Sequence, residues 1–278
     1  MWPAIRPMKP AEALLCARAS ETIYQGKGVP EKALQADGFS EFAWIDLTTV
    51  FEDVCAFVAS SPQYNLLAFR GTQDPQDWME DVYCTPVRFD WIFQAAPAVG
   101  EIHAGFGHTL ADKLANITQT LAGRDQGKAL LITGHSLGGA LAALAAAYLN
   151  LVGASVRPVT GIYTFGQPRI GLHDFCNTYD RILARKLVRF VNKQDLVPRV
   201  PFRGWDYSDE GLMIHFDSNG IPSVEADEWQ NFLARTLQSL GDFVEIMSHV
   251  RVDAGDHSMT GYRELVENSQ QPLAPLLQ

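Results

Sequence analysis

Residues 133 to 140 constrain the fold of this chain more than any other stretch. They read Thr-Gly-His-Ser-Leu-Gly-Gly-Ala and contain a G-x-S-x-G pattern at Gly134, Ser136 and Gly138. An apolar run at 129–132 precedes them, and an Ala/Leu-rich stretch at 140–149 follows. This order predicts a strand, a tight turn and a helix, with Ser136 in a strained conformation that exposes its hydroxyl above the sheet edge.

Such a turn brings two chemical groups together. The Ser136 hydroxyl becomes reachable as a nucleophile, and the Leu137 N–H lies at the start of the helix, where unpaired amides can receive an oxyanion. The alternative is a glycine-rich turn that carries no chemistry. The apolar strand before it and the helix after it favour the first interpretation.

A serine hydroxyl needs a general base and a group that orients the base. In α/β-hydrolases an acid and then a histidine follow the nucleophile along the chain. Asp195 lies in the loop after the predicted strand 187–192, and His257 lies in a polar loop before the helical segment 262–268. We therefore expect Asp195 as the acid and His257 as the base. Asp206 and Asp209 are the alternative acids.

Six motifs of the chain, in order, resemble those of the class 3 lipases, which include the triacylglycerol lipases of filamentous fungi. They are Leu67–Thr72, His103–Phe106, Thr133–Ala140, Thr164–Gly171, Asn192–Arg199 and Asp256-His257. The resemblance covers most of residues 66–262 and implies an α/β-hydrolase fold. It also implies a triad of Ser136, Asp195 and His257, with Thr72 joining Leu137 as the second oxyanion donor.

The segment at about 74–83 resembles the lid of that family. On a short helix over 77–82, Trp78, Met79 and Val82 share an apolar face. Such a lid covers an apolar groove in water and opens at a lipid surface. The alternative is a surface helix packed by one tryptophan.

Two further apolar stretches bear on the substrate. Residues 89–93 are apolar at four of five positions and form either core or the wall of an acyl-binding groove, so Trp91 and Phe93 are candidates for that groove. Residues 225–247 carry one apolar stripe at helical spacing. We expect a helix packed on the sheet, and the alternative is a cap over the acyl site.

The remaining histidines suggest structure rather than chemistry. His135 is expected to be structural rather than catalytic, because the turn directs it opposite to Ser136. His103 is expected to serve packing. No His pair has ligand spacing on one helix and no Cys-x-x-Cys occurs, so we expect neither a metal site nor a cofactor.

Strands and helices alternate along the chain. The predicted strands are 42–46, 54–59, 66–69, 130–133, 161–165 and 187–192; the predicted helices are 10–25, 107–121, 140–149, 173–183, 225–247 and 262–268. This alternation implies a mainly parallel central sheet with helices on both faces. With 278 residues, 47% of them hydrophobic, the chain suits one α/β domain over residues 1–278.

The net charge of the chain limits which molecules it is expected to bind. A formal net charge of −10 argues against nucleic acid and anionic membrane surfaces. A neutral lipid or a small uncharged ester, including one at a lipid–water interface, is the compatible substrate. No apolar run approaches the length of a membrane span.

Four cysteines, Cys16, Cys55, Cys84 and Cys176, are too sparse for a disulfide framework. No secretory signal is visible at the N-terminus. This departs from the fungal lipases, which are secreted and disulfide-bonded. The expectation is either a reduced, cytoplasmic setting or a mature secreted form whose leader has been removed.

Together these features predict a serine carboxylester hydrolase of lipase type that acts through an acyl-enzyme. A feruloyl-type or short-chain esterase is the alternative within the same fold. An alternative of another class is a non-catalytic lipid-binding or signalling module. The presence of Ser136, Asp195, His257 and Thr72 argues against that module.

Overall fold

The structure of the protein is a computed structural model, and it describes residues 7–46, 55–72, 85–94, 96–152, 159–183, 185–201, 203–224 and 255–278. Eight strands form the central sheet in the order β1-β2-β3-β6-β7-β9-β11-β12. They are β1 (Ser40–Asp46), β2 (Cys55–Ser60), β3 (Tyr64–Phe69), β6 (Ala129–His135), β7 (Val159–Phe165), β9 (Leu187–Asn192), β11 (Leu212–Phe216) and β12 (Pro222–Val224). Strands β3 to β11 of this order pair in parallel, and β1, β2 and β12 are antiparallel, so the predicted mainly parallel sheet is confirmed.

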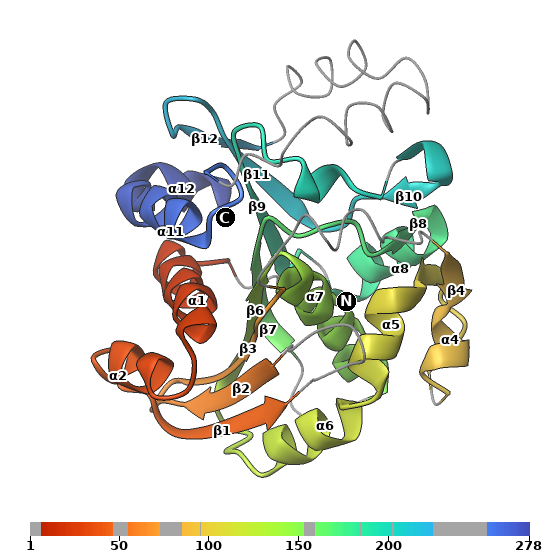
Figure 1. The fold of residues 1–278 in the computed structure, drawn as a ribbon, viewed down its shortest axis with the longest axis horizontal. Coiled ribbons are helices and arrows are strands. Elements are labelled where there is room, and N and C mark those ends of the chain that lie inside the picture. Colours follow the sequence, from red (N-terminus) through yellow and green to blue (C-terminus); the bar gives the residue numbers. More distant parts are fainter. Residues whose placement is uncertain are drawn as a thin grey trace.

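Helices cover both faces of this sheet (Figure 1). One face carries α1 (Pro10–Thr22), continued by the 3-10 turn η1 (Ile23–Gln25), with α2 (Val29–Gln35), α11 (Met259–Asn268) and α12 (Gln270–Leu276). The other carries α5 (Ala104–Ala111), α6 (Leu114–Ala122), α7 (Leu137–Leu151) and α8 (His173–Leu183). Side chains alternate along each strand, so Leu67 and Leu66 of β3 enter separate cores on the two faces.

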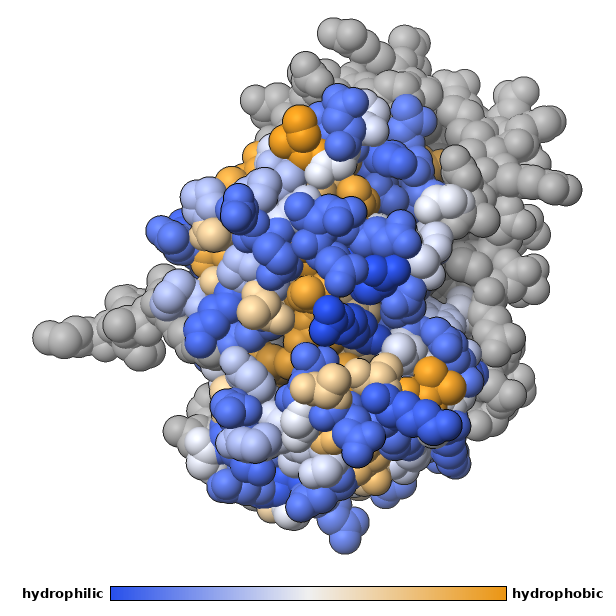
Figure 2. Space-filling model, turned by 90° about the vertical axis from the view of Figure 1, so that its left-hand side faces the viewer, coloured by the Kyte–Doolittle hydropathy of each residue, from blue (hydrophilic) through white to orange (hydrophobic). Residues whose placement is uncertain are grey.

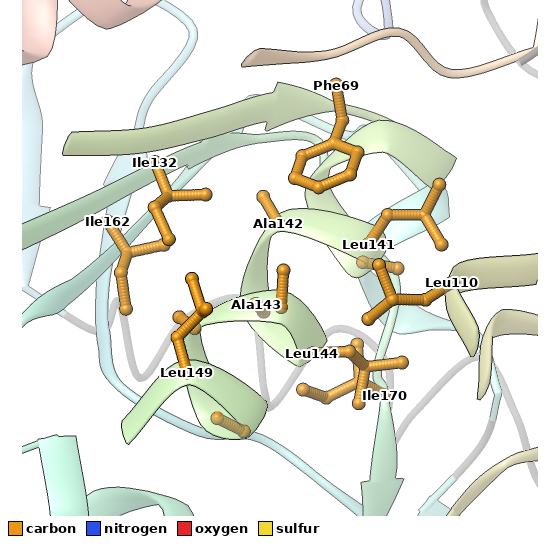
Figure 3. Close-up of a cluster of buried hydrophobic side chains, with 14 of the residues drawn as sticks. Phe69, Leu110, Ile132, Leu141, Ala142, Ala143, Leu144, Leu149, Ile162 and Ile170 are labelled. Carbon is orange, nitrogen blue, oxygen red and sulfur yellow. The ribbon is translucent and has the colours of Figure 1, made fainter. Parts of the chain in front are cut away.

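Helix α7 is the central helix of its face. Twelve of its 15 residues are buried. Figure 3 shows Ala142 and Ala143 of α7 surrounded by Phe69 and Ile132 from the sheet and by Leu110 from α5. A helix that is apolar all round needs partners on every side. This burial holds the N-terminus of α7, which follows Ser136, in one place.

The outer surface of the helix layer that contains α1 is polar. Figure 2, which views the left-hand side of Figure 1, shows hydrophilic residues over most of the described surface, with apolar residues in small groups between them. Such scattered apolar exposure is ordinary for a folded protein. Among the described helices, no segment has both the length and the apolar content of a membrane span.

The expected helix over 107–121 is wrong in its bounds. The chain forms α5 and α6 with a turn at Asp112 and Lys113 between them. Helix α5 packs on α7 and α6 approaches β1, so one straight helix would not bury both apolar sides. Helix α5 also begins earlier, because the His103 side chain caps it by accepting from the Phe106 N–H.

A second, four-stranded sheet was not predicted. Its order is β10-β8-β5-β4, formed by β10 (Tyr207–Ser208), β8 (Gly171–Leu172), β5 (Glu101–His103) and β4 (Pro86–Arg88). Strands of two or three residues are too short to show an alternation of apolar and polar residues in the sequence. The other short elements are α4 (Phe89–Ile92), η2 (Val197–Arg199) and η3 (Arg203–Trp205).

Some of the predictions concern residues that the structure does not describe. The segment at 74–83 and the helix over 225–247 lie outside the described residues. Cys16 and Cys176 are buried free thiols, and Cys84 is outside the described part of the chain.

Candidate active site

The candidate site forms where neighbouring parallel strands end. Phe69 of β3 pairs with Gly134 of β6, and His135 of β6 pairs with Phe165 of β7. Phe165 in turn pairs with Phe190 of β9. The loops that leave these strands carry the candidate residues Thr72, Ser136 and Asp195. This edge is the usual place for a binding site in a parallel sheet.

Ser136 has the strained backbone predicted for it. Its φ is 55° and its ψ is −130°, and it precedes the first residue of α7. The Ser136 N–H donates to Phe165 O at 3.0 Å, and the Gly139 N–H donates to Ser136 O at 2.9 Å. A Cβ atom on Gly134 would lie 2.2 Å from Gly138 O, so only glycine permits this turn. The strand, tight turn and helix expected here are confirmed.

The end of β3 crosses the start of α7 at very short range. A Cβ on Gly138 would lie 2.5 Å from Phe69 O and 2.9 Å from Gly71 N. Thr72 follows Gly71, and Leu137 precedes Gly138, so both candidate oxyanion residues flank this crossing. Both are buried. Leu137 is the first residue of α7, where amide hydrogens have no partner within the helix.

Asp195 and His257 form a buried pair. The His257 Nδ1–H donates to Asp195 Oδ2 at 2.8 Å, with both side chains no more than 2% exposed. Asp195 Oδ1 accepts from the Val197 N–H at 3.0 Å. Of the alternative acids, Asp206 is exposed and Asp209 is bound to Arg169, Arg189 and Arg203. The geometry therefore favours Asp195.

Gly166 connects Ser136 to this pair. It follows Phe165, which accepts from the Ser136 N–H, and a Cβ on Gly166 would lie 2.8 Å from His257 Cε1 and 2.9 Å from Asp195 Oδ2. Ser136 Oγ and His257 Nε2 are both among the buried polar atoms that have no hydrogen-bond partner within the described residues. A nucleophile and a base that await substrate have this pattern.

His135 has structural contacts, as expected, but its ring lies against the proposed base. Its ring centroid lies 4.5 Å from that of His257, and its Nε2 lies 2.8 Å from the His257 carbonyl oxygen. Because a carbonyl accepts only, Nε2 carries the hydrogen, and Nδ1 accepts from the Tyr24 hydroxyl at 3.0 Å. Burial, and then the neighbouring His257, lower the pKa of His135 well below its ordinary value, so the ring is neutral.

Two tyrosines that contact site residues were not predicted from the sequence. Tyr24 reaches His135 across 111 residues, and Tyr262 donates to Asp195 Oδ2 at 2.6 Å. No local pattern marks a tyrosine that contacts a distant residue. The position of Tyr262 one helical turn into α11, close after His257, is the single usable hint.

The other candidate residues lie elsewhere or outside the described chain. Phe93 is in the core, 4.6 Å from Phe89 between ring centroids, whereas Trp91 is 66% exposed beneath the Arg88 guanidinium. Trp78, Met79 and Val82 fall outside the described residues. Within the described ranges, no group of three or more His, Cys, Asp or Glu side chains is arranged to hold a metal ion.

Known proteins share this sequence pattern and this fold. The chain is 27% identical over 259 residues to the triacylglycerol lipase OBL1 of Arabidopsis thaliana, covering 73% of this chain and 49% of that protein. It is 29% identical over 185 residues to phospholipase A1-II 4 of Oryza sativa subsp. japonica, covering 58% and 45%. The chain therefore spans about half the length of these relatives.

Among solved structures, a deletion mutant of the Rhizomucor miehei lipase in complex with the propeptide superposes with a TM-score of 0.67 at 23% identity, covering 80% of this chain and 72% of that one. This likeness shows a shared α/β-hydrolase fold. The model of the family described as "Lipase (class 3)" matches residues 66–205, which is half of the chain and includes Thr72, Ser136 and Asp195. The chain belongs to the class 3 lipase family.

Proposed function

We propose that this protein is a serine carboxylester hydrolase of lipase type that cleaves acylglycerol esters. One observation carries the proposal: Gly166 lies against the buried Asp195–His257 pair, and the residue before it accepts from the N–H of the strained Ser136. Ser136 Oγ and His257 Nε2 are both left without partners among the described residues. The relatives support the substrate class, because both the triacylglycerol lipase and the phospholipase A1 are named for cleavage of acyl esters.

In the proposed reaction these groups act one after another. Ser136 Oγ attacks the ester carbonyl while its proton passes to His257 Nε2, and Asp195 holds the Nδ1–H of the resulting imidazolium. The Leu137 amide, together with the amide and hydroxyl of Thr72, receives the oxyanion of the tetrahedral intermediate. His257 then gives its proton to the leaving alkoxide, and the acyl group stays on Ser136. Water attacks this ester by the same steps and releases the acid.

His135 fits this cycle because it is neutral. An imidazolium forms at His257 in each half-reaction, and a charged neighbour at a ring distance of 4.5 Å would oppose it. The hydrogen bond from His135 Nε2 to the His257 carbonyl also fixes the backbone of the proposed base.

The proposal includes one catalytic domain over residues 1–278, with the segment at 74–83 as a lid over the acyl groove. Helices from both ends of the described chain, α1 and α11, pack on each other and on the same sheet, which supports a single unit.

A fluorophosphonate probe tests the nucleophile. It should label the parent protein at Ser136 with one equivalent, and Ser136→Ala should lose labelling and roughly 10⁴- to 10⁶-fold in turnover. Ser20→Ala is the control, since Ser20 is also fully buried but bonds Thr133 instead. Full hydrolysis by Ser136→Ala would overturn the mechanism. A parent that hydrolyses no ester would favour the binding module.

A substrate panel tests the ester class. Emulsified triacylglycerol, phospholipid vesicles and a dissolved short-chain ester should be offered at matched ester concentration. Preferential release of fatty acid from either glycerolipid supports the proposal. Cleavage of the dissolved ester alone would instead identify an esterase on the same triad.

A further inference from the structure

Tyr262 contacts the proposed acid directly. Its side chain is fully buried in the first turn of α11, and its hydroxyl donates to Asp195 Oδ2 at 2.6 Å. The same hydroxyl accepts from the Asn192 N–H at 3.0 Å at the end of β9. Asp195 Oδ2 is also the oxygen that accepts from His257 Nδ1. The phenol and the imidazole therefore share one carboxylate oxygen.

We infer that Tyr262 is a positioning residue for the proposed hydrolysis: by sharing Asp195 Oδ2 with His257, it fixes the carboxylate plane and moderates its pull on the imidazolium. This inference rests on the proposed function. With the Val197 N–H on Oδ1, donors bind both oxygens, so the carboxylate has little freedom to rotate.

The environment of Tyr262 makes its hydroxyl the donor in the hydrogen bond to Asp195. Burial, and then the Asp195 charge, raise the pKa of Tyr262 well above its ordinary value, so the phenol keeps its hydrogen. Each donor that binds an anionic oxygen lowers the negative charge available to the other. Removal of the phenol hydroxyl should leave a stronger interaction between the carboxylate and a protonated His257.

Other ionisable groups face this pair from neighbouring elements. His135 of β6 lies against the His257 ring, and Arg199 of η2 interacts electrostatically with Tyr262. Asp256, next to His257, pairs with Lys193 at 3.6 Å. All of them are unchanged in a variant that removes only the phenol oxygen.

The experiment compares Tyr262→Phe with a matched variant, Tyr163→Phe. Tyr163 is also fully buried, donates to a buried carboxylate (Glu12 Oε2, 3.0 Å) and accepts from a backbone N–H (Lys9, 3.1 Å). Both variants therefore lose the same kinds of hydrogen bond, and both should melt at a lower temperature. They differ in that Glu12 lies outside the proposed triad.

Tyr262→Phe should lower kcat on the order of tenfold with little change in KM, a loss typical of a group that orients a catalytic residue. It should also move the acid limb of the kcat/KM profile to higher pH. The downfield proton resonance of His257 Nδ1, assigned by its loss in His257→Gln, should move further downfield. Tyr163→Phe should keep the parent's kcat, pH profile and resonance.

A kcat, pH profile and resonance that match the parent in Tyr262→Phe would overturn the inference while the proposed function stands. A parent that the fluorophosphonate does not label would overturn the proposed function, and the resonance would still report the hydrogen bond. If circular dichroism shows that Tyr262→Phe does not fold, 3-fluorotyrosine at position 262 replaces it. This stronger donor should move the acid limb to lower pH, and an unmoved limb counts against the inference.

Discussion

At the scale of single residues, the site depends on a close approach between the backbone of Gly166 and the side chains of Asp195 and His257. Gly166 has a φ of +57° and lies against both partners of the Asp195–His257 pair. A side chain there would occupy the space of His257 Cε1 and Asp195 Oδ2. Glycine is therefore required at this position for space as well as for its backbone conformation.

Gly166→Ala should lower kcat because the new methyl group displaces the His257 ring, and a misplacement of about 1 Å can cost about 10²-fold. Gly26→Ala is the matched control: Gly26 has a φ of +86°, but a Cβ added there would have no atom of the described residues within 4 Å. The control should lose some stability and keep its kcat. Equal kcat values in the two variants would contradict the assignment of Gly166 to the site.

The choice of acid is also decided at this scale. Asp195→Asn should fold normally and lose on the order of 10⁴ in kcat, because the amide disfavours the required histidine tautomer. Asp209→Asn should instead lose about 3 kcal/mol of stability, since it removes a carboxylate that pairs with the buried Arg169 and Arg189, with kcat per folded molecule unchanged. Steady-state kinetics and urea unfolding separate the two. A largely active Asp195→Asn would move the acid to the loop at 203–211.

At the scale of elements, the candidate site is formed by the first residues of several loops. Buried strands and the buried helix α7 hold these residues in place. The crossing of β3 over α7 at Gly71 and Gly138 determines where the chain enters the segment after Thr72. That segment leads to the proposed lid at 74–83. Its entry point, next to the proposed oxyanion donors, is suited to a cover over the site.

Trp78→Ala tests the lid. If this ring anchors an open lid at the interface, the variant should hydrolyse emulsified long-chain ester far more slowly than the parent but a dissolved short-chain ester about as fast. The parent's rate should also rise as substrate passes its solubility limit. Smooth saturation through that limit, with both activities reduced equally in Trp78→Ala, would mean that the segment is a fixed wall and the protein an esterase.

At the scale of the whole molecule, buried neutral histidines couple folding to pH. Burial lowers the pKa of His103 to about 4, whereas an unfolded histidine titrates near 6.5. Between these values the unfolded chain holds a proton that the folded chain does not. Stability should therefore fall as the pH decreases from about 6.5 to about 4.

His103→Asn should flatten this dependence by up to about 3 kcal/mol across the window, because asparagine can still cap α5 but does not titrate. Urea unfolding from pH 4 to pH 7 measures it. His108→Asn, at an exposed position of the same helix, is the control and should keep the parent's slope. An unchanged slope in His103→Asn would assign the acid sensitivity to other groups.

The sequence alone was enough to predict the parallel sheet, the helices on both faces and the tight turn at Ser136. These features follow from local information: apolar periodicity sets strands and helices, and glycines at fixed spacing permit the turn. Asp195 and His257 could be chosen for the same reason, since each follows or precedes a readable element. Their hydrogen bond at 2.8 Å agrees with that choice.

Only the tertiary structure decided the rest. It placed His135 against His257, brought Tyr24 and Tyr262 to the site, put Phe93 in the core and Trp91 in solvent, and assembled the second sheet from strands of two or three residues. Each of these outcomes depends on contacts between residues far apart in the chain. A local pattern specifies the shape of an element, whereas the partner of a side chain is decided by which elements pack together.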